Sequence, residues 1–238
     1  MKTQAYFEAR HAAIKNNRWF RYFTVFNRVA LAAGFLPSGY VKIMGERFTD
    51  LHNNQPMGHY LEALYHTGYY YTVIGIVQVL AALLLLIPRT ALLGVLIYFP
   101  VILNICILSF SVRFEGSLLS SPLMVLSCIY LMAWDYDRLK YILPVMTARR
   151  DTEKQTRPVS NRFPVGFAAG SFAAVVIIVA IILNAFNIMP RNTLKDCQGQ
   201  CDERRDPEAC KRFCECIHLQ GEPLRKCLTE YKKAANAK

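Results

Sequence analysis

Residues 165–189 read VGFAAGSFAAVVIIVAIILNAFNIM and contain no Lys, Arg, Asp or Glu. A helix needs roughly 20 such residues to cross a hydrocarbon core of roughly 30 Å. Three further stretches, at 67–87, 91–112 and 117–134, are also free of charge. With 53% hydrophobic and only 19% charged residues, the chain has too little polar sequence to coat a soluble domain of 238 residues. The sequence therefore predicts an integral membrane protein.

A fifth apolar segment, Tyr22–Lys42, is interrupted by Arg28 and Pro37 and ends in a charge at Lys42. Charges inside a span must be paired or must reach an interface, so this is the weakest of the five spans that we expect. Runs such as LAALLLLI at 80–87 show no alternation of the kind a membrane strand has. We therefore predict an all-α fold, a polytopic membrane helix bundle of four helices plus a fifth transmembrane helix.

Charge and cysteine content divide the chain into five parts. Basic residues dominate 1–21 and the loop 135–164, which predicts that both are cytoplasmic. We expect the amino-terminal segment to be retained, since no clear signal cleavage site follows it. A four-span bundle at 22–134, a fifth span at 165–189 and a tail at 190–238 complete the division. The net charge of +11 lies mainly beside the spans, which favours the lipid bilayer as a partner and predicts no nucleic-acid binding.

The tail contains six of the eight cysteines, although its eleven Lys and Arg residues argue against an outside location. Clustered cysteines are typical of a small disulfide-stapled domain in an oxidising space, which predicts an extracytoplasmic, periplasmic tail. Two pairs have i, i+4 spacing, and Asp206-Pro207-Glu208 is a helix start. Two antiparallel helices could link Cys197 to Cys214 and Cys201 to Cys210, and Cys216 and Cys227 would then form the third bond. This is the pairing that we prefer among the fifteen that six cysteines allow.

Two alternatives for the tail remain open, a metal or cluster site held by thiolates and a set of exchangeable thiols. The assigned compartment favours structural disulfides, and we predict no metal site. Cys106 and Cys128 lie inside apolar spans, where a small side chain at a helix interface is the simpler interpretation. His59, Glu62 and His66 share one helix face, which fits an amphipathic entry helix better than a metal or proton site.

Two polar residues inside the predicted spans, Arg28 and Gln78, fall at similar depths, so they could touch. Arg28 is the more unusual, because a charge in a span is expensive. An alternative is that Arg28 reaches the nearby interface or pairs with Asp135 or Asp137.

Three segments resemble the DoxX family of bacterial inner-membrane proteins: FNRVALAAGFLPSGYVKIMGERF at 26–48, GIVQVLAALLLLIPRTALLGVL at 75–96 and DYDRLK at 135–140. The resemblance covers about residues 20–143. It implies a four-helix inner-membrane bundle and a link to sulfur or thiol redox chemistry and quinone-connected complexes. Relatives often have an acid where this chain has Gln78. The fifth span and the cysteine tail lie outside the resemblance.

The resemblance yields two leading hypotheses of function. In the first, the chain is an accessory or anchoring subunit of a membrane complex, with protein partners. In the second, it is a quinone-linked oxidoreductase subunit with a thiol or sulfur donor, in which Arg28, Lys42 and Gln78 border a quinone pocket between the first two spans. Quinone is a possible cofactor under this hypothesis, which also needs a redox centre, and the tail thiols are the one candidate that the sequence offers. The sequence leaves open whether the chain is an enzyme. A transporter is a third hypothesis, but we detect no inverted repeat.

Overall fold

The computed structural model describes residues 10–142, 160–202 and 206–236. The helices are, in chain order, α2 (Arg18–Ile43), α3 (Pro56–Tyr65), α4 (Tyr69–Leu86), α5 (Ala91–Val112), α6 (Glu115–Leu118), α7 (Ser120–Trp134), α8 (Tyr136–Ile142), α9 (Val165–Ala185), α10 (Leu194–Gly199), α11 (Pro207–His218) and α12 (Leu224–Asn236). The described residues form no strand apart from an isolated bridge between Asn17 and Ser160. The all-α prediction is confirmed for this part of the chain.

Among the described residues, four helical segments are long and apolar enough to cross a membrane: α4, α5, the α6–α7 segment Glu115–Trp134, and α9. They correspond to four of the five spans expected from the sequence, which supports a multi-pass membrane protein. α2 is not among them, because Arg18, Arg21, Arg28 and Lys42 lower its hydropathy. With 26 residues it is about 39 Å long, so its length is sufficient and its role as a fifth span remains a prediction.

The core of the bundle lies where α2, α4, α5 and α7 meet. Tyr98 of α5 is fully buried, and its hydroxyl donates to the carbonyl oxygen of Leu31 on α2 at 3.1 Å. Its ring stacks on Phe35, with centroids 3.5 Å apart. Cys128 of α7 is buried in the same cluster, as expected for a small side chain at a helix interface. Close packing of such side chains holds helices together in lipid, where apolar burial gives little driving force.

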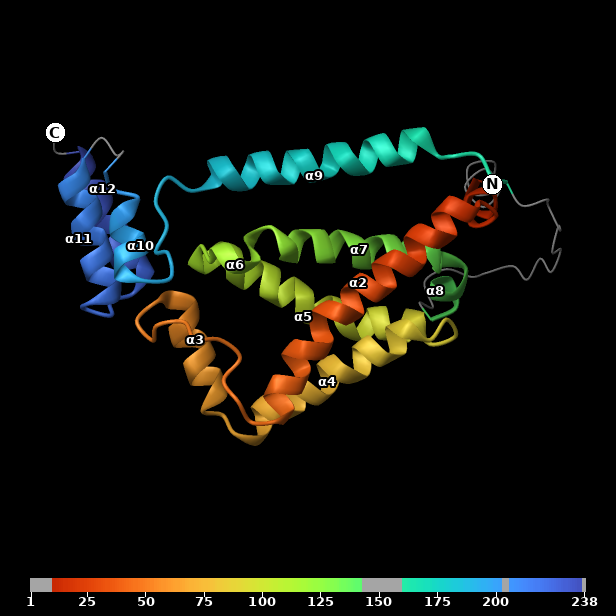
Figure 1. The fold of residues 1–238 in the computed structure, drawn as a ribbon, viewed down its shortest axis with the longest axis horizontal. Coiled ribbons are helices and arrows are strands. Elements are labelled where there is room, and N and C mark those ends of the chain that lie inside the picture. Colours follow the sequence, from red (N-terminus) through yellow and green to blue (C-terminus); the bar gives the residue numbers. More distant parts are fainter. Residues whose placement is uncertain (1–9, 143–159, 203–205, 237–238) are drawn as a thin grey trace.

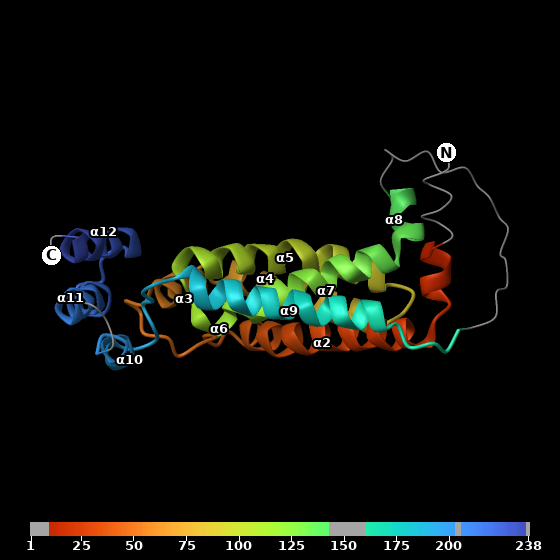
Figure 2. The ribbon, with the colours of Figure 1, turned by 90° about the horizontal axis from the view of Figure 1, so that it is seen from above.

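α9 runs alongside the bundle but contributes no buried residue (Figures 1 and 2). Its aromatic contacts with the bundle lie near its two ends. Phe167 packs on Phe20 with ring centroids 4.7 Å apart, and Phe186, which follows the helix, lies 6.4 Å from Phe110. The middle of the helix, rich in Val and Ile, is therefore open to the surrounding medium.

The tail helices α10, α11 and α12 form a second small core built on disulfides. Asp206 caps α11 by accepting from the backbone N–H of Ala209 at 3.1 Å, and Pro207 occupies the first turn, as the sequence predicted. The turn after α11 contains Gly221, whose φ of +67° favours glycine. α12 then begins at Leu224, directly after Pro223.

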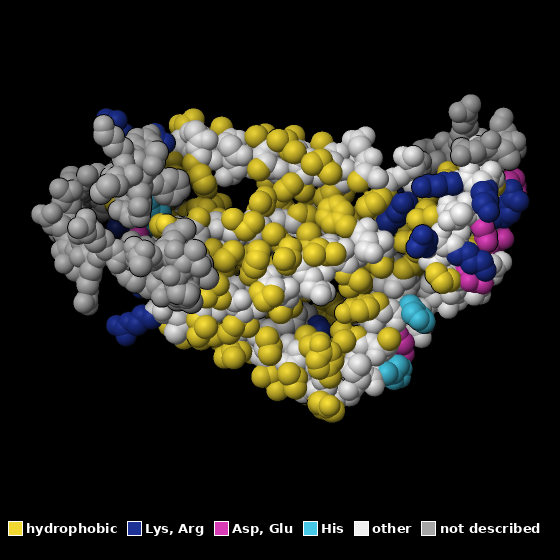
Figure 3. All heavy atoms as spheres, turned by 180° about the vertical axis from the view of Figure 1, so that it is seen from behind, with side chains coloured by type: hydrophobic (Ala, Val, Ile, Leu, Met, Phe, Trp, Pro, Cys, Tyr) yellow, Lys and Arg dark blue, Asp and Glu magenta, His cyan; other side chains and the backbone are white. Residues whose placement is uncertain are grey.

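The tail and α8 lie at opposite ends of the long axis (Figures 1 and 2). Apolar side chains cover the middle of the molecule, and the charged side chains gather towards the ends (Figure 3). At the α8 end, Lys15 pairs with Asp137 at 2.8 Å. Most of the predicted basic loop, residues 143–159, lies outside the described residues.

Candidate functional site

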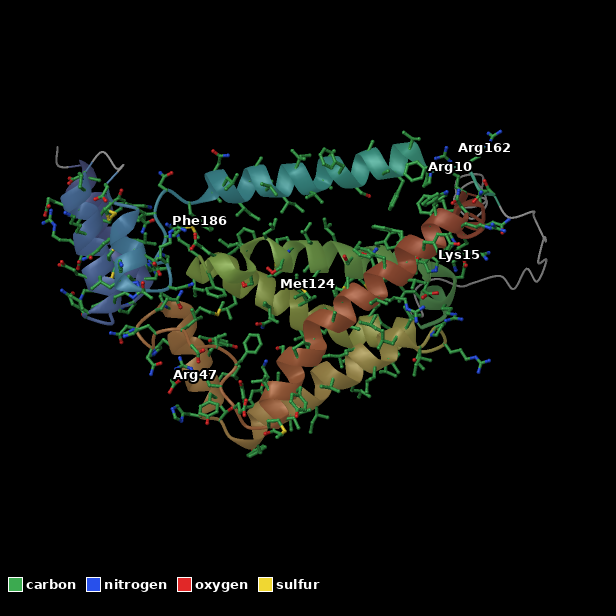
Figure 4. All side chains as sticks on the ribbon, in the orientation of Figure 1. Arg10, Lys15, Arg47, Met124, Arg162 and Phe186 are labelled. Carbon is green, nitrogen blue, oxygen red and sulfur yellow. A yellow bond between two sulfur atoms is a disulfide. The ribbon has the colours of Figure 1, made fainter. Side chains whose placement is uncertain are left out.

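A half-open cavity of about 670 Å³ lies between α2, α3, α4, α5 and the α6–α7 segment. Its volume falls within the roughly 300–1,000 Å³ range of small-molecule pockets. Its walls are largely apolar, formed by side chains such as Phe35, Ile102, Ile105 and Met124. Figure 4 labels Met124, which comes from α7. The cavity is therefore suited to a molecule that is mostly lipophilic.

The cavity wall also contains polar side chains, among them Ser38, Lys42, Thr49 and Gln78 on the side of α2 and α4, and Asn104, Ser117, Ser120 and Ser121 on α5 and the α6–α7 segment. Lys42 is buried, with 5% of its surface exposed. Its Nζ donates to the carbonyl oxygen of Ser38 at 3.0 Å and to the Ser38 hydroxyl at 2.7 Å. The Ser38 hydroxyl in turn donates to Oε1 of Gln78 at 3.4 Å. Two of the three residues predicted to bind a cofactor, Lys42 and Gln78, are thus linked through Ser38.

Aromatic rings surround the ammonium group of Lys42. Nζ lies 4.2 Å from the ring centroid of Phe48 and 5.8 Å from that of Tyr71. The Tyr71 hydroxyl donates to the carbonyl oxygen of Glu46 and accepts from the N–H of Phe48, both at 3.1 Å. These bonds fix the segment after α2 against α4, so both rings are held in place beside the lysine.

Two glycines explain why α2 and α4 come close enough to build this group. A Cβ on Gly39 would lie 2.7 Å from the carbonyl oxygen of Gly75 and 3.1 Å from Cβ of Gln78. A Cβ on Gly75 would lie 2.8 Å from Cβ of Lys42. Small residues at a membrane helix interface permit such an approach of the backbones. The glycines therefore place Lys42 and Gln78 on the same wall.

Arg28, the third predicted cofactor residue, lies elsewhere. Its Nε donates to the carbonyl oxygen of Leu85 at 2.6 Å and its Nη2 to that of Leu86 at 2.8 Å. It therefore caps the carboxyl end of α4, where carbonyl groups have no helical partner. The expectation that Arg28 touches Gln78 is wrong in this structure, because Arg28 lies opposite the last turn of α4, about two turns beyond Gln78.

The alternative, in which Arg28 pairs with Asp135 or Asp137, is met in part, because the Asp135 carboxylate lies close enough to interact electrostatically with the Arg28 guanidinium. Asp137 pairs with Lys15, and its other oxygen lies 3.6 Å from Nδ1 of His11. Arg28 interacts with Asp135 through its charge. Its direct contacts are with the α4 carbonyl groups.

Two of the three residues predicted to share a face of the entry helix, Glu62 and His66, belong to an ion-pair cluster. In α3, the Glu62 carboxylate faces two partners, Nε2 of His66 at 3.0 Å and Nε of Arg47 at 3.0 Å. His59 is exposed and is not part of this cluster. Arg47 lies beside α3 in Figure 4. The cluster fixes the loop after α2 to the helix that forms one wall of the cavity.

The tail cysteines form the three predicted bonds, Cys197–Cys214, Cys201–Cys210 and Cys216–Cys227. Sulfur atoms of Cys201, Cys210 and Cys214 lie within 4.8 Å of one another, as a thiolate metal site would also require. All three are in disulfides in this structure, so the arrangement gives no free thiolate to a metal.

Several contacts dock the tail on the bundle, at the end where the cavity lies. Asn54 donates to the carbonyl oxygen of His218 at 2.7 Å, and Arg113 donates to that of Ile188 at 2.7 Å. Arg191 forms an ion pair with Glu115. The segments that carry Asn54, Arg113 and Glu115 also supply Met57, Phe114 and Gly116 to the cavity wall. The tail is therefore attached to the two segments that close the cavity on this side.

Comparison with known proteins gives a partial match. The chain is 44% identical over 73 residues to an uncharacterized protein, YwoB, of Bacillus subtilis. The match covers 31% of this chain and 46% of that protein, so the chain spans less than half the length of this curated relative. No family model matches, and no solved structure matches. The DoxX resemblance therefore remains a prediction.

Sequence reasoning missed most of the cavity. Ser38 and Thr49 were not singled out, nor were the α3 residues Met57 and Leu61 that close its side. Ser38 lies four residues before Lys42 on the same helix face, and this spacing was a signal that could have identified it. No local sequence pattern identifies Thr49 as a cavity residue, because the conformation of the loop after α2 places it there.

Proposed function

We propose that this chain is an accessory subunit of a membrane complex and that its bundle binds one lipophilic molecule with a polar head. The observation that carries the proposal is the cavity of about 670 Å³, apolar over most of its wall and polar around Lys42. Pockets of this size and character are the usual sites of small ligands. The disulfide tail, docked beside the cavity, supports a second role as a platform for a protein partner.

A quinone is the ligand class that the DoxX resemblance names. Lys42 and Gln78 offer hydrogen-bond donors to a quinone carbonyl, which supports this hypothesis in part. Electron transfer would also need an electron carrier. The six tail cysteines form disulfides, so they offer no free thiol for this role. The accessory role therefore needs fewer assumptions than the role of an oxidoreductase, and the identity of the ligand tests both.

The test is to purify the full-length protein from its native membrane in a mild detergent and identify lipophilic molecules that copurify by mass spectrometry. Ile105→Trp fills the cavity from α5. Ile107→Trp is the matched control, because Ile107 lies on the same helix, does not line the cavity and is 63% exposed. The wild type and Ile107→Trp should retain the same molecule, and Ile105→Trp should lose it. Equal retention by all three proteins, or by none, would contradict the proposal.

A further inference from the structure

The cavity carries a positive charge that the protein does not balance. Lys42 is the only buried Lys or Arg among the residues that the structure describes. Across those same residues, no carboxylate forms an ion pair with it. The oxygen acceptors of Ser38 and the faces of Phe48 and Tyr71 are typical surroundings of a cation. They carry no net charge, and buried charges in proteins are usually paired with an opposite charge.

Unused hydrogen-bonding groups line the same cavity as this charge. Two of the three N–H groups of Lys42 are used by Ser38, which leaves one donor. Gln78 is 2% exposed, and its amide nitrogen has no hydrogen-bond partner among the described residues. The hydroxyl oxygen of Thr49 is also buried without a partner in that part of the chain. All three residues line the same cavity. A buried polar atom without a partner, such as the Thr49 hydroxyl, is rare in proteins, and a ligand group that accepts hydrogen bonds would satisfy it together with the free donors of Lys42 and Gln78.

From these observations we infer that the cavity binds an anionic amphiphile, a long-chain carboxylate or alkyl phosphate. The inference rests on the proposed function, and it names the ligand class. The anionic head lies against Lys42, Gln78 and Thr49, and the chain extends along the apolar wall formed by Ile105 and Met124. A neutral head such as an alcohol or a quinone carbonyl would accept the same hydrogen bonds but would leave the buried charge unbalanced.

The first experiment changes the ligand and leaves the protein intact. Purified full-length wild-type protein in a neutral detergent binds a fluorescent long-chain fatty acid, and four probes compete for the site: palmitate, hexadecyl phosphate, hexadecanol and a benzoquinone with an alkyl chain. Palmitate or hexadecyl phosphate should compete at least about tenfold more strongly than hexadecanol or the quinone, because a charge-assisted bond is stronger than a neutral one. Which of the two anions competes better distinguishes a carboxylate head from a phosphate head.

The second experiment changes the charge of the site. Lys42→Met keeps the length of the side chain and removes the ammonium group, and Lys42→Gln keeps a donor without charge. Both should weaken palmitate binding about tenfold or more and weaken hexadecanol binding much less, because only palmitate loses the pairing of opposite charges. Lys233→Met, at an exposed position of the tail, is the control and should bind palmitate like the wild type.

Three results would overturn the inference. If the neutral probes compete as well as palmitate does, the charge of Lys42 does not select the ligand. If they bind and palmitate does not, the inference fails while the proposed cavity for a lipophilic ligand survives. Should no probe bind and Ile105→Trp change nothing, the proposed function fails and the inference fails with it.

Discussion

His218 joins the tail to the bundle through both its backbone and its ring. Its carbonyl oxygen accepts from Asn54, and its Nε2 donates to the carbonyl oxygen of Pro190 at 2.7 Å. The residue is 4% exposed, and its Nδ1 is buried without a partner among the described residues. Burial lowers the pKa of His218, and nearby His52 acts in the same direction, whereas the Pro190 bond and Asp196 act in the opposite one. The docked tail therefore favours the neutral imidazole.

This histidine should make docking of the tail sensitive to acid. Because the pKa is lower in the docked state than the ordinary value of about 6.5, the undocked state takes up the proton first as the pH falls. Stability from the neutral His218 is present above pH of about 6.5 and is lost as the pH falls through the lowered pKa. Hydrogen exchange of the α11 amides in the full-length protein should be faster at low pH than at neutral pH, after correction for the intrinsic pH dependence of exchange.

Matched histidine variants separate this effect from general acid sensitivity. His218→Gln should remove most of the difference between the two pH values. His59→Gln, at an exposed position of α3, should leave it as in the wild type. If His218→Gln keeps the full pH dependence, another group is responsible.

Arg28 and Lys42 were both predicted to lie near Gln78, but only Lys42 does, and the reason is geometric. Counting depth along each span placed Arg28 level with Gln78, which assumes that α2 and α4 end at the same height. In the structure Arg28 lies opposite Leu85, so about ten residues of α2 extend beyond that contact. The stagger between two helices depends on how their surfaces fit, and residue counting along one chain does not contain it. Lys42 and Gln78 meet because Gly39 and Gly75 set that fit.

At the scale of elements, the contact between α2 and α4 depends on the absence of a Cβ atom at Gly39. Gly39→Ala would place a methyl group 2.7 Å from the Gly75 carbonyl oxygen and 2.8 Å from Cγ2 of Val79. The helices must then move apart, at a cost of about 1–3 kcal/mol, typical of overpacking. Thermal unfolding in detergent should show a lower Tm and weaker ligand retention.

A glycine in open space provides the control for that substitution. A Cβ added at Gly170 of α9 would meet no neighbouring atom within 4 Å, so Gly170→Ala introduces no clash. Its Tm should equal or exceed that of the wild type, because alanine favours the helix. An equal loss of Tm in both variants would show that the close approach of α2 and α4 is not the cause.

Three disulfides hold the helices of the tail together, and the Cys201–Cys210 bond lies within the loop that Cys197–Cys214 closes. Cys197→Ala and Cys214→Ala each remove the same bond, which for a small stapled domain is worth roughly 2–5 kcal/mol. The double variant should therefore lose little more stability than either single one. Denaturant unfolding of the full-length protein, followed by protease sensitivity of the tail, measures these losses.

A double variant that breaks two different disulfides is the control for the double variant within one disulfide. Combining Cys197→Ala with Cys227→Ala breaks two bonds, and its loss should clearly exceed that of either single change. Additive losses for Cys197→Ala and Cys214→Ala would contradict the pairing.

The tail pairing could be predicted because its determinants are local. Residues four apart lie on one helix face, and Asp206, Pro207 and Gly221 mark the helix ends within a few positions of the cysteines. The cavity could not be predicted in this way, since five helical segments far apart in the sequence build it. Sequence alone supplied two of its polar residues, Lys42 and Gln78, without the Ser38 hydroxyl that links them.

At the scale of the whole molecule, the tail and α8 at opposite ends predict that they lie on opposite sides of the membrane (Figure 2). Disulfides are rare in reducing compartments, so the tail should be the extracytoplasmic end. Protease added to intact spheroplasts should remove the tail and spare an epitope tag at the amino terminus. Lysed spheroplasts are the control, in which both should be cleaved. Protection of the tail in intact spheroplasts would contradict this orientation.

The loose attachment of α9 has a consequence for how the protein responds to bilayer thickness. Its 21 residues are about 31 Å long, close to the roughly 30 Å of a typical hydrocarbon core, and a mismatch is normally met by tilting. Because no residue of α9 is buried, tilting disturbs little packing along its length, and the displacement appears at its ends. The carboxyl end leads through Phe186 and Ile188, held by Arg113, into the tail. A thinner or thicker bilayer would thus displace the segment that joins α9 to the tail. The position of the tail, and of the cavity wall to which it is attached, would therefore depend on the lipid composition of the membrane.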